Sequence, residues 1–283
     1  MPAGVDFGPL PARKKGRRNE LQRPFSFVGR HRADRPYGKA EPERMNLVQL
    51  NNIDHAELRI TPRAGAAFGD AANQALIFPA EFEQVQREFA IVFRRRDEGM
   101  QAYALLGLDR DENLFLADDH WTSRYVPASH QRGPFSIGIV RAPGDAIDEP
   151  MLQVDLDDLR VGEDAGLLLF LEHGGNTPYL DHVTGVLRLL YEGMNTAPAA
   201  YAALDEAGLL TPVTLTVDVS EERRYTIPDV LVVDIEQMAA LTGDPLERLH
   251  ASGVLRLAIL AAASLGNIQQ LIARKQPLLN QFG

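Results

Sequence analysis

The sequence predicts an α+β protein, with an antiparallel, sheet-rich part over about 46–171 and helices and one hairpin over about 172–283, packed in one globule. In the first part, short runs of β-branched, aromatic and aliphatic residues are bounded by Gly, Pro, Asp or Asn. In the second part, helix start signals precede apolar residues at helical spacing. The length of 283 residues and the 45% hydrophobic content are enough for a sizeable core.

Six short apolar runs are expected to be strands, several of them antiparallel neighbours. They are Phe89–Phe93, Ala102–Leu106, Asn113–Leu116, Phe135–Val140, Met151–Leu156 and Leu167–Leu171. The stretch Pro79–Glu88 breaks this pattern. Its proline at a first helical position, the glutamate in the first turn and the apolar Phe82 and Val85 three residues apart predict one short helix.

A helix is expected to begin at Thr177 and Pro178 and to end at Gly193, because apolar residues repeat at helical spacing between them. A second short helix is predicted from Pro198 to about Ala207, where Gly208 follows. The alternating segment 213–219 and the segment 224–227 predict a β-hairpin with one solvent-facing side.

Capping signals predict the last helices. Asp234 with Gln237 frames one helix, and Asp244 with Pro245 and Glu247 begins another. After Gly253, a third helix carries an apolar stripe that we expect to pack on the domain. The stripe consists of Val254, Ala258, Ala261, Leu265, Ile268 and Ile272.

The formal charge of −10 is unevenly distributed. Residues 1–44 hold eleven Lys or Arg and five Asp or Glu, a net charge of +6; removing them from the totals of 29 and 39 leaves 18 basic and 34 acidic residues, or −16, in 45–283. We interpret 1–44 as a disordered basic tail or as sequence upstream of a native start at Met45, and 45–283 as the folded domain. An acidic domain repels nucleic acid, so only the basic cluster at 13–18 could bind it, and no nucleic-acid partner is expected.

Several chemistries are excluded or poorly supported by residue type. With no cysteine there is no disulfide, thiolate nucleophile or cysteine-ligated metal. No signal-peptide pattern or apolar run of about 20 residues is present, which predicts a soluble, cytoplasmic protein without a transmembrane segment. No serine lies in a GxSxG motif, and the Gly-rich stretch 172–176 is interpreted as a tight strand–helix connection.

Two motifs resemble parts of metal sites. His55 and Glu57 have the HxE spacing of iron-dependent oxygenases, and on a strand both would lie on one face, but no signal marks a distal ligand. Asp109–Asn113 begins like an EF-hand loop but lacks its glycine and final glutamate, so a polar turn is favoured. The acidic segment 145–164 is interpreted as a solvated face or loop rather than a cation site. We therefore expect no cofactor.

The most unusual segment is 118–135, DDHWTSRYVPASHQRGPF, which contains the only tryptophan. Aromatic and arginine side chains together can bind a planar or anionic group, but they also form structural corners, and the residues alone leave both readings open. The candidate ligand-binding residues are Trp121, Arg124, Tyr125, Arg132 and Phe135.

Four segments make the chain similar to a known family. They are NNIDHAELRI at 51–60, ALIFPAEFEQVQREFAIVFRR at 75–95, ALLGLDRDENLFLADDHWTSRYVPASHQRGPF at 104–135 and LERLHASGVLRLAILAAASLGNIQQLI at 246–272. Together they resemble the SapC family of bacterial proteins over roughly 45–283. The resemblance implies a link to surface-layer gene regions and to gene neighbourhoods for TonB-dependent uptake, flavin-dependent halogenase-like proteins and cupin-like oxygenases. It supplies no catalytic residues.

The resemblance and the absence of a complete catalytic motif lead to the expected function. We expect an accessory or binding protein of the SapC type, linked to surface-layer or TonB-dependent uptake systems, which recognises an unknown small molecule or protein partner through the 121–135 segment. The alternative is a metal-dependent, iron oxygenase-like enzyme that uses His55 and Glu57.

Overall fold

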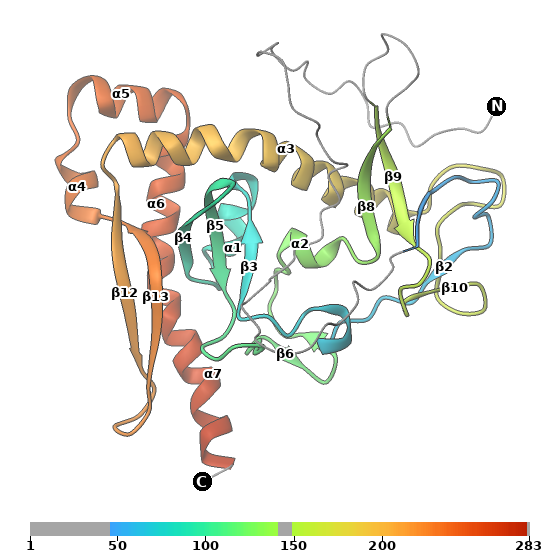
Figure 1. The fold of residues 1–283 in the computed structure, drawn as a ribbon, viewed down its shortest axis with the longest axis horizontal. Helices are drawn as coiled ribbons and strands as arrows, with labels where there is room; N and C mark the ends of the chain where they lie inside the picture. The colour runs from blue at the N-terminus through green and yellow to red at the C-terminus, as the bar shows by residue number, and fades with distance from the viewer. Residues whose placement is uncertain (1–45, 141–148, 282–283) are drawn as a thin grey trace. The chain divides into compact units, whose positions relative to one another are not determined.

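The structure is a computed structural model that describes residues 46–140 and 149–281. It contains helices and several antiparallel sheets, which confirms the α+β class (Figure 1). The basic segment 1–44 lies outside the described residues, as does part of the acidic segment 145–164.

The chain divides into two compact units, and each unit combines two separated stretches of sequence. The first unit comprises Met1–Pro62 and Arg132–Arg188, and the second comprises Arg63–Gln131 and Leu189–Gly283. The candidate recognition segment 121–135 therefore crosses the boundary between the units.

The first unit holds two three-stranded antiparallel sheets. In one, β9 (Glu149–Asp155) lies between β1 (Leu47–Gln49) and β8 (Phe135–Val140). In the other, β2 (Arg59–Ile60) lies between β10 (Val161–Gly162) and β11 (Leu167–Leu168). The predicted strands at 135–140 and 151–156 are confirmed, whereas the run 167–171 is a strand only over its first two residues.

The second unit is built on a five-stranded antiparallel sheet with the order β12–β13–β4–β5–β3. Its strands are β3 (Gln74–Ile77), β4 (Ile91–Arg96), β5 (Gly99–Leu105), β12 (Leu210–Asp218) and β13 (Arg224–Val233). The predicted hairpin at 213–227 is confirmed and extends further at both ends. Its ladder shifts register between Val213 and Leu215, where β13 contributes an extra residue and Asp229 has a φ of 54°.

Helices cover this sheet in the second unit. The predicted helix at 79–88 is present as the 3-10 turn η2 (Pro79–Glu81) followed by α1 (Phe82–Val85). The C-terminal helices are α4 (Ile235–Ala240), α5 (Gly243–Ala251), α6 (Val254–Ser264) and α7 (Ile268–Gln281), with the 3-10 turn η3 (Leu265–Asn267) between the last two. Asp234 caps α4 as predicted, by accepting from the backbone N–H groups of Glu236 and Gln237.

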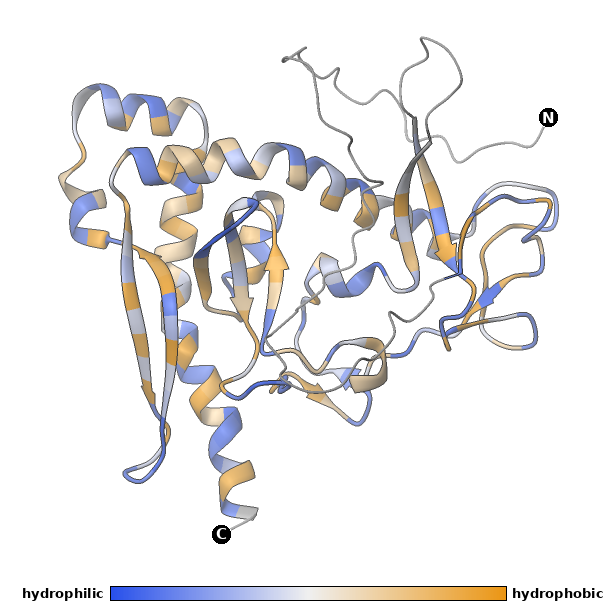
Figure 2. Cartoon of the chain, viewed as in Figure 1, coloured by the Kyte–Doolittle hydropathy of each residue, from blue (hydrophilic) through white to orange (hydrophobic). Residues whose placement is uncertain are grey.

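The apolar face of α6 packs on the sheet. Helix α6 contacts β4, β13 and α1, and Val254, Ala258 and Ala261 of the predicted stripe are buried. Figure 2 shows the corresponding hydrophobic colouring on α6 and on the strands of this unit. An aromatic cluster of Phe82, Phe93 and Tyr201 lies in the same core, with Phe93 and Tyr201 ring centroids 5.4 Å apart.

Within the described residues, one helical stretch, Val254–Asn280, is long and apolar enough by length and composition alone to cross a membrane. Polar residues interrupt this stretch, so it contains no uninterrupted apolar run of about 20 residues. A hydrogen bond also joins this stretch to the sheet, since the backbone N–H of Ile91 in β4 donates to the Ser264 hydroxyl at 2.8 Å.

The prediction of two helices over 177–207 is wrong, because helix α3 (Pro178–Glu206) runs unbroken through Gly193 and Pro198. Gly193 does not end the helix. A Cβ at this position would lie 2.4 Å from Cγ of Phe78, so the glycine allows close packing of helix and ring. Thr177 does begin the helix as predicted, and its hydroxyl accepts from the N–H of Leu180 at 3.4 Å.

The remaining short elements lie near the candidate segment. They are the 3-10 turn η1 (Ala66–Phe68), the hairpin of β6 (Leu116–Ala117) and β7 (His120–Trp121), and the one-turn helix α2 (Ala128–Gln131). Of the predicted strand at 113–116, only Leu116 lies in a strand, the two-residue β6, and the prediction is wrong for 113–115. Asn113 instead makes a turn: its amide donates to the Asp70 carbonyl and its Oδ1 accepts from the Phe115 N–H, while Phe115 is buried.

Candidate functional site

The candidate segment 121–135 lies in the second unit only from Trp121 to Gln131, and we call this part the recognition segment. It begins in β7, continues without regular structure and ends in α2. Two glutamates from the η2–α1 region, Glu81 and Glu88, accept four hydrogen bonds from residues of this segment.

Glu81 is a buried carboxylate, 1% exposed, at the end of η2. Its Oε2 accepts from the backbone N–H of Phe78 at 2.9 Å, which completes the capping of its own turn. Its Oε1 accepts from the hydroxyl of Tyr125 at 2.9 Å and from the backbone N–H of Ala128 at 2.8 Å. Burial raises the pKa of Glu81 even though these three hydrogen bonds act to lower it.

Glu88 fixes the preceding residues of the recognition segment. Its Oε2 accepts from the backbone N–H groups of Arg124 and Tyr125, at 2.9 and 3.1 Å. The side chain of Tyr125 thus points to Glu81 while its backbone is bound by Glu88. Burial and the neighbouring Glu81 carboxylate raise the pKa of Tyr125, so the phenol stays protonated and donates.

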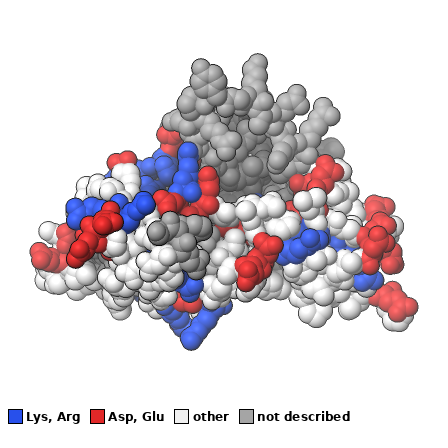
Figure 3. Space-filling view, turned by 90° about the horizontal axis from the view of Figure 1, so that it is seen from below, with Lys and Arg blue, Asp and Glu red and all other residues white. Residues whose placement is uncertain are grey.

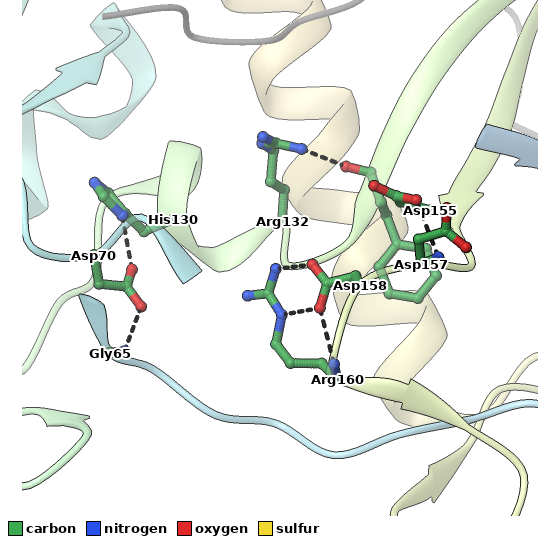
Figure 4. A network of polar contacts seen from close by, with 9 residues as sticks. Gly65, Asp70, His130, Arg132, Asp155, Asp157, Asp158 and Arg160 are labelled. Atoms are coloured by element: carbon green, nitrogen blue, oxygen red, sulfur yellow. Dashed lines mark hydrogen bonds and ion pairs between the residues drawn. The ribbon is translucent and has the colours of Figure 1, made fainter. Parts of the chain in front are cut away.

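A third carboxylate, that of Asp70, binds the end of the recognition segment. Nδ1 of His130 lies 2.8 Å from Oδ1 of Asp70, and both side chains are largely buried (Figure 4). The other carboxylate oxygen of Asp70 accepts from the backbone N–H of Gly65 at 2.9 Å. The Trp121 ring lies edge-on to the His130 ring with centroids 5.1 Å apart. The imidazole therefore connects the tryptophan to a buried carboxylate.

Two candidate side chains remain at the surface of this unit. Trp121 is partly exposed and Arg124 is exposed. The backbone N–H of Arg124 is bound by Glu88. Its guanidinium makes no ion pair or hydrogen bond with a residue that the structure describes. On the face drawn in Figure 3, acidic and basic side chains gather in small groups between uncharged areas. The segment therefore offers an aromatic ring and an available guanidinium three residues apart.

Arg132 and Phe135 belong to the first unit, and their surroundings differ. The Arg132 guanidinium donates to the carbonyl of Phe135 at 3.0 Å, and burial lowers the pKa of Arg132. The Phe135 ring is fully buried and lies 6.4 Å from the ring of Tyr179. These contacts make Arg132 and Phe135 part of the packing of their unit. The five candidates are thus divided between the units, with Trp121, Arg124 and Tyr125 in the second.

A family comparison places this geometry in context. The model of the SapC family matches residues 50–271, which is most of the chain. The chain belongs to the SapC family. No curated protein and no solved structure matches it.

In this SapC chain, the predicted HxE pair does not lie on a strand. His55 and Glu57 are in a turn before β2, so the expectation that one strand face presents both is wrong. The backbone N–H of Asn51 donates to Nδ1 of His55 at 3.2 Å, and Glu57 is exposed. The described parts of the chain contain no group of three or more His, Asp or Glu arranged to hold a metal ion.

The EF-hand-like stretch 109–113 of the SapC chain is a polar turn, as predicted. A lysine from helix α7 contacts it. Nζ of Lys275 from α7 lies 2.6 Å from Oδ2 of Asp109 and 2.5 Å from Oε1 of Glu112. Lys275 is the only lysine after residue 45 and is buried. Burial lowers its pKa, but hydrogen bonds to the two carboxylates outweigh burial and raise the pKa overall. The ammonium group thus offsets part of the negative charge of the turn.

Sequence reasoning missed the carboxylates that support the recognition segment of the SapC protein. Glu81 and Glu88 were noted only as helix residues, and Asp70 was not singled out. The signal that could have found Glu81 is its position three residues after Phe78, the spacing of a capping glutamate. Nothing in the sequence indicated that its second oxygen accepts hydrogen bonds from a segment more than 40 residues away.

Proposed function

We propose that this SapC-family protein is an accessory binding protein whose recognition segment binds a ligand or partner with a planar or anionic group. The observation that carries the proposal is the fixed backbone of the segment, bound by Glu81 and Glu88, with Trp121 and Arg124 left at the surface. A surface ordered before binding loses less conformational entropy when the complex forms.

The side-chain chemistry favours an aromatic carboxylate or a similar group. A guanidinium matches a carboxylate in a planar, two-bond geometry, and an indole ring offers a face or an edge to an aromatic ring. Arg124 is also an available positive charge in a part of the chain, 45–283, with a net charge of −16. Because the surrounding chain is negative overall, it repels anions in general. An anion would therefore be bound at Arg124 itself and not over the whole surface.

A calorimetric titration of the full chain with benzoate, benzamide and benzamidine tests this chemistry. Benzoate should bind more tightly than the neutral and cationic probes. Trp121→Ala and Arg124→Gln should each weaken benzoate binding by about tenfold or more, roughly 1.4 kcal/mol. Arg110→Gln, at another exposed arginine of the same unit, is the control and should leave affinity unchanged. Equal binding of the three probes, or benzoate affinity that Arg124→Gln does not change, would contradict the proposal.

We also propose that the binding protein acts in surface-layer or TonB-dependent uptake systems, from the cytoplasmic side. Family membership and the gene neighbourhoods that the resemblance implies support this step. Fractionation of cells that produce a tagged chain, followed by cross-linking, tests it. Recovery in the cytoplasmic fraction with a component of such a system is expected, and recovery only outside the cell would contradict the assigned side.

A further inference from the structure

Strand β12 forms one border of the five-stranded sheet in the second unit. The sheet order ends at β12, and among the described strands it pairs only with β13 (Figure 1). Edge strands usually carry charged side chains that prevent pairing with another chain. No residue from Leu210 to Val217 is charged, and Pro212 is the only edge-blocking residue in this stretch. The edge beyond Pro212 is therefore able to accept another strand.

The hydrogen bonding of the hairpin indicates which backbone groups point outward. The N–H of Val219 donates to the carbonyl of Arg223, toward β13, whereas Pro212 has no N–H to give. Residues of an antiparallel strand alternate between bonding to one side and to the other. This alternation assigns the N–H and C=O groups of Thr214 and Thr216 to the outer side of β12. Both side chains are exposed.

The outer stretch has a self-complementary sequence. Residues 213–217 read Val-Thr-Leu-Thr-Val, which is the same in both directions. If a second copy paired antiparallel about a two-fold axis at Leu215, Val213 would face Val217, Thr214 would face Thr216, and Leu215 would face its own copy. Apolar and threonine cross-strand pairs of this kind stabilise antiparallel sheets. A two-fold contact also requires one surface to match itself.

We propose that two copies of this chain associate through their β12 edges, antiparallel and centred on Leu215, so that their sheets become continuous. Charge does not oppose contact at this site. Two copies with a net charge of −16 in 45–283 repel each other in general, but 213–217 is uncharged. The adjoining Asp218 is paired with Arg224. Five residues bounded by Pro212 make a short contact, so the dimer depends on protein concentration.

Cysteine cross-linking of the full chain tests the register, because the chain has no cysteine of its own. Leu215→Cys would face its own copy across the axis, within disulfide reach. Val213→Cys would lie four residues from its copy, roughly 13 Å at strand spacing, beyond disulfide reach. We expect Leu215→Cys to form a disulfide-linked dimer at least about tenfold faster than Val213→Cys. Equal rates would overturn the proposed pairing.

Sedimentation velocity of the full chain tests the edge independently. A lysine at Thr216 places charge at the pairing edge, whereas a lysine at Thr226, the exposed β13 residue opposite Thr216, does not. We expect a monomer–dimer equilibrium in the wild type, a dimer weakened about tenfold or more by Thr216→Lys, and little effect of Thr226→Lys. A wild type that stays monomeric at all concentrations, or equal effects of the two lysines, would overturn the proposal.

Discussion

The hydroxyl of Tyr125 donates a hydrogen bond of 2.9 Å to the buried carboxylate of Glu81. The same carboxylate oxygen accepts from the backbone N–H of Ala128, so one glutamate binds the recognition segment at two points. The recognition segment is thus bound by a carboxylate from η2, more than 40 residues earlier in the chain.

Tyr125→Phe should lower the free energy of unfolding by about 1.5–3 kcal/mol, because it removes a buried hydrogen bond to a charged group. Tyr103→Phe is the control, since its hydroxyl donates to the uncharged side chain of Gln101 and its loss should cost only about 0.5–1.5 kcal/mol. Urea denaturation of both variants measures the difference. A cost for Tyr125→Phe no larger than for Tyr103→Phe would argue against the role assigned to Glu81.

The raised pKa of Glu81 predicts a pH dependence with a definite sign. The folded protein takes up a proton at this carboxyl at higher pH than the unfolded chain, whose value is near 4.5. Between these two pKa values the contribution of Glu81 to stability therefore rises as pH falls, and above the folded pKa its burial is a constant cost. Denaturation of wild type and Glu81→Gln from pH 7 to pH 4.5 should show this rise only in the wild type.

The exposed Glu83 on α1 provides the control for that titration. Glu83→Gln should keep the wild-type slope of stability against pH in the same window. If Glu81→Gln also kept that slope, another group would have to be its source.

Gly193→Ala should destabilise the protein by about 1–3 kcal/mol, because the new Cβ would overlap the Phe78 ring. Gly185→Ala in the same helix has open space around its Cβ and should instead stabilise by roughly 0.5–1 kcal/mol through helix propensity. Thermal or chemical denaturation distinguishes the two signs. A stabilising Gly193→Ala would mean that α3 and Phe78 are not in close contact.

Lys275→Met should lower the free energy of unfolding by about 2–4 kcal/mol, because it leaves the partly buried Glu112 carboxylate without its cation. The two acids should respond unequally. Glu112, with a side chain 18% exposed, should cost more on replacement by Gln than Asp109, 53% exposed, costs on replacement by Asn. If urea denaturation gave the same loss of unfolding free energy for both replacements, burial of the acid would not determine the strength of its ion pair with Lys275.

Local signals predicted much of the fold. Capping at Thr177 and Asp234, strand composition at 135–140 and alternation in the β12–β13 hairpin are properties of neighbouring residues, and each is confirmed. Gly193 was misread because a helix-ending glycine and a packing glycine look alike in one dimension. Only the approach of Phe78, more than a hundred residues earlier, separates them.

The candidate site was predictable only in part, for the same reason. Composition drew attention to Trp121, Arg124 and Tyr125, but Phe135 is fully buried, which composition could not indicate. The recognition segment is bound by residues far away in the sequence, such as Glu81 and Asp70. The spacing of neighbouring residues does not indicate such long-range hydrogen bonds.

Fluorescence quenching of Trp121, the only tryptophan, tests the recognition segment most directly. The proposed function requires Trp121 to be accessible and close to the positive charge of Arg124. Iodide should therefore quench the wild type more strongly than Arg124→Gln at constant ionic strength, while the neutral quencher acrylamide affects both equally and Arg110→Gln matches the wild type. Iodide quenching that Arg124→Gln leaves unchanged, or a tryptophan that neither quencher reaches, would contradict it.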